Sequence, residues 1–121
     1  MLAVGPKDLL FLFSEPTDMR KSFDGLCGLI RNCTDKNPMD RNIYIFVNKS
    51  RNMIKLLRFE GDGFAIYFKR LEKGRIELPQ KHNIGTASLK ISHATVMMML
   101  EGIGLENEKI GSDISLKTVF N

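Results

Sequence analysis

Apolar and polar positions follow two periods along the chain, and these predict a strand followed by a helix. Residues 9–13 form a short apolar run between proline-containing segments, which is typical of a buried strand. An apolar residue then recurs at steps of four, three and four residues, the period of a helix with one apolar face: Met19, Phe23, Leu26 and Ile30. Thr17 is placed to cap this helix, which is expected to end near residues 31–34.

Two glycines, Gly25 and Gly28, lie inside this predicted helix. Each costs about 1 kcal/mol of helix stability relative to alanine. Their spacing of three residues places both on similar sides of the helix. We therefore expect another backbone to approach the helix closely there.

A period of two replaces the helical period after residue 41. Residues 42–48, 53–59 and 64–70 alternate as strands do, and residues 75–78 are a candidate for one strand more. The connections are short, and glycine and aspartate in Glu60–Gly63 supply the positive φ angles that a tight hairpin needs. Sequential strands with short turns predict an antiparallel meander.

Pairing Phe59 with Phe64, and Val47 with Met53, assigns the meander residues to two faces. One face is apolar, with Lys55 its only charge before Arg70, and is expected to pack on the first helix: Ile43, Ile45, Val47, Met53, Leu57, Phe59, Phe64, Ile66 and Phe68. The other face is mixed: Tyr44, Phe46, Ile54, Leu56, Arg58, Ala65, Tyr67 and Lys69. It is either a stacking platform for single-stranded nucleic acid or core under a second helix.

Residues 87–91 predict a short strand, and Ser92 is placed to cap a second helix that runs to Leu100. The expected fold is therefore α+β, an antiparallel meander of about four to five strands packed against an N-terminal amphipathic helix, with a second short C-terminal helix. A length of 121 residues fits a single domain. Residues 9–79 would form its core and residues 80–121 a more variable strand, helix and tail.

The positive charge is concentrated in the middle of the chain. The whole sequence has 18 Lys and Arg against 14 Asp and Glu, a net charge of +4. Nine Lys and Arg and three Asp and Glu lie between Arg41 and Arg75, so this stretch alone carries 9 − 3 = +6. Charge gathered in this way attracts phosphate or an acidic protein surface.

Several classes of protein are excluded by what the sequence lacks. The longest apolar runs have five residues, whereas a membrane span needs ~20. Because the first residues do not form a signal peptide, we expect a cytoplasmic protein without membrane contact, in which Cys27 and Cys33 stay reduced. The spacing of these cysteines and of His82 and His93 fits no metal site, so neither a metal nor another cofactor is expected.

Catalytic signatures are absent in the same way. The sequence has no G-x-S-x-G motif, and its acids stand mostly at predicted turns and caps. We therefore expect no catalytic residues and no enzyme activity. A metal-dependent nuclease that uses Asp24 or Asp62 remains the enzymatic alternative.

Two blocks of sequence resemble a known family. Residues 16–26, PTDMRKSFDGL, resemble the signature P-x-D-M-R-K-S-F-D-G-L of the TnpB-type accessory proteins of the insertion sequence 66 family. Residues 45–74 are similar to that family's F-x-N … K-x-L … G-D-G-F … W-Y-K-R-L-E-x-G, in the same order and spacing. Phe59 and Tyr67 stand where relatives often have tryptophan.

The resemblance implies a bacterial mobile-element protein that assists DNA transposition, a form of DNA recombination, while a separate transposase supplies the catalytic carboxylates. The much larger RNA-guided nucleases that share the name TnpB are a different class. We expect a non-catalytic accessory that binds DNA phosphates at the element's ends, the transposase, or both. The alternative is a protein adaptor for the transposase without DNA contact. The expected contact residues are Arg20, Lys21, Arg58, Tyr67, Lys69, Arg70, Lys73 and Arg75.

Overall fold

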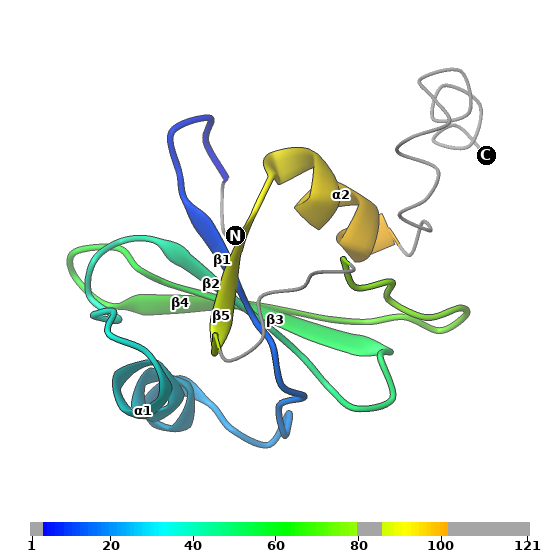
Figure 1. Cartoon of the computed structure of the whole chain (residues 1–121), viewed down its shortest axis with the longest axis horizontal. Coiled ribbons are helices and arrows are strands. Elements are labelled where there is room, and N and C mark those ends of the chain that lie inside the picture. The colour runs from blue at the N-terminus through cyan, green and yellow to red at the C-terminus, as the bar shows by residue number, and fades with distance from the viewer. Residues whose placement is uncertain (1–3, 80–85, 102–121) are drawn as a thin grey trace.

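The computed structural model describes residues 4–79 and 86–101, which form a five-stranded sheet with a helix on each face (Figure 1). The strand order is β4-β3-β2-β1-β5. The α+β fold expected from the sequence is confirmed. Its elements are β1 (Leu10–Phe13), α1 (Phe23–Cys33), β2 (Ile43–Val47), β3 (Met53–Phe59), β4 (Phe64–Arg70), β5 (Ser88–Ile91) and α2 (His93–Glu101).

The sheet is mixed because β1 lies inside it. Strands β2, β3 and β4 form the expected antiparallel meander, whereas β1 pairs parallel with β2 on one side and antiparallel with β5 on the other. Helix α1 is the crossover connection that a parallel pair requires. Residues 75–78 form no strand; they run beside the β2–β3 turn, where the Ile76 N–H donates to the Arg51 carbonyl at 2.6 Å.

The register between β2 and β3 differs by one residue from the predicted one. Val47 lies opposite Ile54, not Met53, while Phe59 lies opposite Phe64 as expected. Because side chains alternate along a strand, a slip of one residue moves every β2 side chain to the other face. The predicted face assignment of β2 was therefore wrong.

The side chain of Asn48 accounts for this register. The Oδ1 of this side chain accepts the N–H groups of Asn52 and Met53, both at 3.0 Å. The backbone N–H of Asn48 donates to the Met53 carbonyl at 3.2 Å. Asn48 thus pairs with Met53 and leaves a four-residue loop. Arg51 closes that loop in the left-handed region, with φ of 58°.

The core on the α1 face is aromatic. Tyr44 and Phe46 are fully buried beneath the helix, and the ring centroids of Phe13 and Phe46 lie 4.7 Å apart. Helix α1 contributes Leu26, Cys27 and Ile30 to this core. The stacking platform for nucleic acid therefore does not exist at Tyr44 and Phe46, because both rings are interior groups.

The opposite face packs on α2, so the alternative in which a second helix covers that face is confirmed. Its core is aliphatic, and Val96 and Met99 bring the helix into it: Leu10, Leu12, Ile43, Ile45, Val47, Ile54, Leu56, Ile76 and Ile91. Tyr67 is half-buried at its margin. The predicted cap of α2 is confirmed, since the Ser92 Oγ accepts the Thr95 N–H at 3.1 Å.

Helix α1 starts at Phe23 and not after Thr17 as predicted. Thr17 is buried, and its N–H donates to the Val47 carbonyl at 2.8 Å. Residues 17–22 are therefore not helical, and Lys21 and Asp18 close a turn in this segment. The expected close backbone approach was also wrong. Apart from the neighbouring residues and the backbone of the helix itself, no described atom would lie within 4 Å of a Cβ at Gly28, and the neighbour of Gly25 is the flexible Lys21 side chain.

Among the described residues, neither helix has the length and apolar character needed to cross a bilayer.

Candidate functional site

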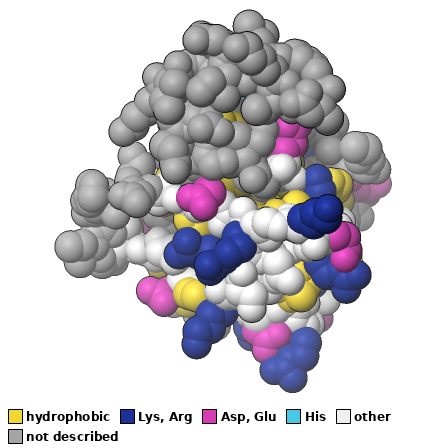
Figure 2. All heavy atoms as spheres, turned by 90° about the vertical axis from the view of Figure 1, so that its right-hand side faces the viewer, with side chains coloured by type: hydrophobic (Ala, Val, Ile, Leu, Met, Phe, Trp, Pro, Cys, Tyr) yellow, Lys and Arg dark blue, Asp and Glu magenta, His cyan; other side chains and the backbone are white. Residues whose placement is uncertain are grey.

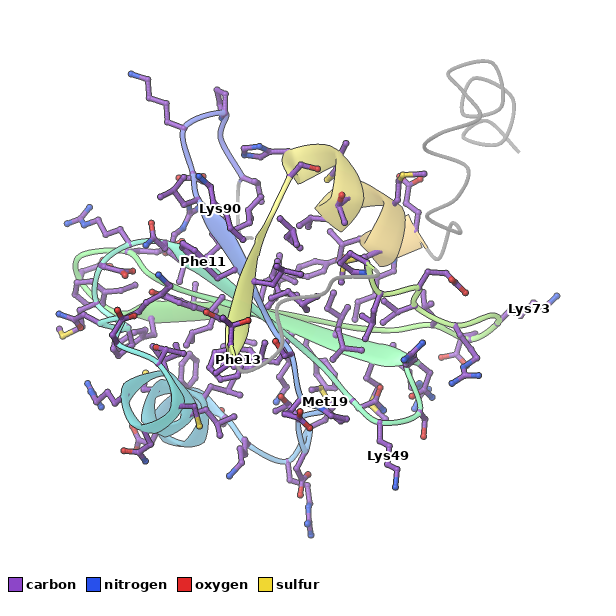
Figure 3. All side chains as sticks on the ribbon, viewed as in Figure 1. Phe11, Phe13, Met19, Lys49, Lys73 and Lys90 are labelled. Atoms are coloured by element: carbon purple, nitrogen blue, oxygen red, sulfur yellow. The ribbon has the colours of Figure 1, made fainter. Side chains whose placement is uncertain are left out.

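Two loops meet at one end of the sheet and bring cations together. The β2–β3 turn and the segment after β4 are joined by backbone hydrogen bonds: the Leu71 N–H donates to the Asn52 carbonyl at 2.7 Å, beside the Ile76–Arg51 bond. We call the cations on these loops the cationic end: Lys49, Arg51, Arg70, Lys73 and Arg75. Figure 3 shows Lys49 and Lys73 projecting outward from this end.

The cationic end carries a local excess of positive charge. Its five cations are accompanied by the acids Glu72 and Glu77, so residues 48–52 and 70–77 hold 5 − 2 = +3. Arg70 pairs with Glu72 at 3.0 Å, and both side chains are exposed. The other four cations are exposed and form no ion pair with any residue in 4–79 or 86–101. Figure 2 looks at this side of the molecule and shows several Lys and Arg groups with acids between them.

An open groove of about 700 Å³ adjoins the cationic end. Its apolar wall includes Met19, Met53 and Phe68, and the Phe68 side chain is unusual for a large hydrophobic residue in being 52% exposed. We call this the Phe68 groove. Polar and charged residues complete its lining: Thr17, Asp18, Arg20, Asn48, Lys49 and Ser50, with Pro16.

Lys55 holds the two walls of this groove together. The residue is only 7% exposed, and its Nζ donates to the carbonyl oxygens of Met19 at 2.9 Å and Lys21 at 2.7 Å. The same ammonium lies 4.8 Å from the centroid of the Phe68 ring, within the range of a cation–π contact. No role was predicted for Lys55, although a single charge on an otherwise apolar sheet face indicates a buried lysine that needs polar partners.

The predicted contacts Arg20 and Lys21 lie beside the groove. Arg20 is 91% exposed, and its guanidinium binds the Asp18 carboxylate at 2.6 Å. These hydrogen bonds, together with one from the Arg20 N–H, lower the pKa of Asp18 to about 2. Asp18, two residues away, thus neutralises the charge of Arg20. The Lys21 ammonium is exposed and forms no ion pair with a described residue.

Arg58 lies away from the cationic end, near the other end of β3. It pairs with Asp8 at 2.8 Å, and both side chains are largely buried. The Gly5 N–H also donates to this carboxylate, and with Arg58 it lowers the pKa of Asp8 despite the opposing effect of burial. Arg58 therefore braces the segment before β1.

Lys69 and Tyr67 lie on the α2 face of β4. The Lys69 Nζ donates to the Leu100 carbonyl at 2.6 Å, in the last turn of α2, where carbonyls lack helical partners and a cation is favoured. Of the eight predicted contacts, Arg70, Lys73 and Arg75 gather at one place. Lys49 and Arg51, on the β2–β3 turn, join them. They were not predicted as contacts, although a short polar connection such as residues 48–52 is typical of an exposed turn.

Groups for metal chemistry are not assembled in the described part of the chain. No cluster of three or more His, Cys, Asp or Glu is placed there to hold an ion, and His82 lies outside the described residues. His93 donates from Nε2 to the Gly5 carbonyl at 2.7 Å. Cys27 is buried, which raises the pKa of its thiol.

Comparison with known proteins decides the family. The family model described as "IS66 Orf2 like protein" matches residues 8–110, a range that includes the groove and the cationic end. The chain belongs to the IS66 Orf2-like family. It is therefore an accessory protein associated with an insertion sequence, as the resemblance of the two sequence blocks implied.

One relative of this IS66 Orf2-like chain is a protein of Sinorhizobium fredii (strain NBRC 101917 / NGR234) named uncharacterized protein y4hO. It is 29% identical over 103 residues, which cover 85% of this chain and 87% of the relative. No solved structure matches the chain.

Proposed function

We propose that this protein assists transposition without catalysing it, by contacting the DNA backbone of the element through its cationic end. The observation that carries the proposal is the set of exposed cations on two joined loops, four of which have no ion-pair partner among the described residues: Lys49, Arg51, Lys73 and Arg75. Such cations neutralise phosphates and release condensed counterions.

Backbone contacts position a protein on DNA, and contacts to base edges specify the sequence. The proposed contacts come from loops and are all charges, so binding is expected to depend on salt more than on sequence. With four phosphate contacts on duplex DNA, log K should fall against log salt with a slope of about −3.6. Arg70 pairs with Glu72, but exposed ion pairs are weak, so a DNA phosphate can take the place of the Glu72 carboxylate. Arg70 would then add a fifth phosphate contact.

The test is fluorescence anisotropy with duplexes from the element's ends across a range of salt. Changing Lys49→Glu and Lys73→Glu together should weaken binding at least tenfold and flatten the salt slope. The matched control, Lys7→Glu with Lys90→Glu, makes the same charge change at exposed lysines elsewhere and should cost less than threefold. Equal losses in the two variants, or no binding by the native protein at low salt, would refute the proposal.

The Phe68 groove favours a second candidate, an adaptor that seats an apolar side chain of the transposase. Its support is the exposed Phe68 ring beside Met19 and Met53, with polar groups at the rim. Ser50→Trp should fill the groove and reduce co-purification with the transposase several-fold. Asn32→Trp, an equally bulky change on exposed α1, should not. Unchanged capture by the Ser50 variant would remove this candidate.

A further inference from the structure

The outer edge of β4 has the features of an unused pairing surface. Strand β4 is terminal in the sheet, so its outer side has no strand partner within residues 4–79 and 86–101. Its seven residues pair with β3 without a bulge, and none of them is proline. Bulges and prolines are devices that keep edge strands from pairing with another chain.

The backbone groups that face outward can be identified from the hydrogen bonds at the two ends of the β3–β4 pair. The Glu60 N–H donates to the Gly63 carbonyl and the Leu71 N–H to the Asn52 carbonyl, both at 2.7 Å. In an antiparallel pair such bonded positions recur at every second residue. Ala65, Tyr67 and Lys69 therefore bond inward to β3. The N–H and C=O groups that point outward belong to Phe64, Ile66, Phe68 and Arg70.

We propose that this edge binds the same edge of a second copy of the chain, with the two β4 strands antiparallel. A two-fold axis at Tyr67 places Phe64 opposite Arg70 of the second copy and Ile66 opposite its Phe68. This register uses all four outward-facing residues of each strand, and the two strands contribute identical surfaces, as a closed two-fold dimer requires.

The charge along β4 favours a second copy in this orientation. The turn before β4 holds two acids, Glu60 and Asp62, whereas residues 69–73 hold three cations and one acid, a balance of +2. Antiparallel pairing brings the acidic turn of one copy near the basic end of the other. Parallel pairing would bring like charges together.

The side chains agree with the backbone. Phe64, Ile66 and Phe68 share the α1 face of β4, and the exposed fraction of the Phe68 ring offers apolar surface beside this edge. Pairing of Ile66 with Phe68 of the second copy makes two apolar cross-strand contacts, related by the two-fold axis. Apolar cross-strand pairs of this kind stabilise a sheet.

The first test is sedimentation equilibrium of the full chain, which should approach twice 13.8 kDa as concentration rises. Ile66→Pro removes an outward N–H and leaves the β3–β4 bonds intact, so it should weaken the dimer at least tenfold. Ile66→Ala, the matched control, loses comparable packing but keeps the N–H and should weaken it less. A native protein that stays monomeric at high concentration would overturn the proposal.

A cross-linking test reads the register and does not depend on Ile66. In a Cys33→Ser background, Tyr67→Cys places two thiols across the axis, where Cα atoms of such a pair lie ~4.5 Å apart. Ala65→Cys, the control on the same face, leaves the thiols offset by four residues, roughly 13 Å along the strands, too far for a disulfide. Oxidation should cross-link only the Tyr67 variant. Equal cross-linking of both variants, or of neither, would contradict the proposed pairing.

Discussion

The Nζ atom of Lys55 lies 2.9 Å from the carbonyl oxygen of Met19, so a buried lysine of β3 holds the backbone that leads into α1. The same ammonium binds the Lys21 carbonyl and faces the Phe68 ring. One side chain therefore fixes three parts of the Phe68 groove: the segment before α1, the start of β3 and the end of β4. The geometry of the groove depends on this contact.

Replacing Lys55→Met should lower the free energy of unfolding by about 2–4 kcal/mol. The change keeps the aliphatic stem but removes the donor for two carbonyl oxygens, and unpaired buried polar groups are costly. Urea denaturation measures the loss, and hydrogen exchange should increase at residues 19–22. Lys49→Met, at an exposed lysine, is the control and should stay within about 0.5 kcal/mol of the native protein. A Lys55 variant as stable as this control would contradict the role assigned to Lys55.

Replacing Asp8→Asn should destabilise the protein by about 1–2 kcal/mol at neutral pH, because the Arg58 partner loses its opposite charge. The folded-state pKa of Asp8 is lowered, so its contribution is fully present above the unfolded value near 3.8 and is lost as pH falls through the folded value. The stability difference between native and variant protein should therefore shrink in denaturation series as pH falls below 3.8. Asp62→Asn, in an exposed turn, should show no such trend. A difference independent of pH would show that the carboxylate charge is not responsible.

Tyr44 should ionise only as the protein unfolds. Burial and the hydrogen bond that its hydroxyl donates to Asp40 at 2.6 Å raise its pKa well above the usual value near 10. A raised folded-state pKa contributes stability below the unfolded value, and this contribution is lost as pH rises through the folded value. Ultraviolet titration of tyrosinate should show a phase that coincides with alkaline unfolding and disappears in Tyr44→Phe. Ionisation of Tyr44 in the native fold, before circular dichroism changes, would contradict this.

Two glycines should respond to alanine in opposite directions. Gly28→Ala should stabilise the protein by about 1 kcal/mol, because helix propensity improves and the Cβ meets no described atom. Gly61→Ala should destabilise by about 1–2 kcal/mol, since φ is +99°, in the left-handed region that residues with a Cβ rarely adopt. Thermal unfolding of the two variants measures both changes. A gain at Gly61 would mean that the turn relaxes more easily than its φ angle implies.

The sequence predicted the structure where the causes are local. The predicted register of the β3–β4 hairpin was correct because Gly61 and Asp62 form a two-residue turn, which by itself places Phe59 opposite Phe64. The β2–β3 register was wrong because it depends on the Asn48 side chain, whose hydrogen bonds can be seen only in the folded loop. Likewise, the first helix lost its predicted start because Thr17 bonds to Val47, 30 residues away.

The sequence predicted that the candidate site is positively charged, but it did not predict which of the cations form it. The excess of cations between residues 41 and 75 was visible in the sequence, whereas the partner of each cation was not. Arg58 pairs with Asp8 over 50 residues, and Lys69 binds the Leu100 carbonyl over 31, so both are engaged in holding the fold. The polar turn that holds Lys49 and Arg51 was visible in the sequence, but its position beside residues 70–77 depends on hydrogen bonds that the sequence pattern does not show.

The place of β5 has a consequence for how the chain matures on the ribosome. Leu10 pairs with Ile91, a separation of 91 − 10 = 81 residues, whereas the meander is closed by turns of a few residues. The meander can therefore form early in synthesis, while the closure of so long a loop comes late. Until α2 emerges, the aliphatic face around Leu12 and Ile45 stays open to water. A product truncated before Ser88 would keep this apolar surface exposed, so we expect chaperones to bind it and proteases to degrade it.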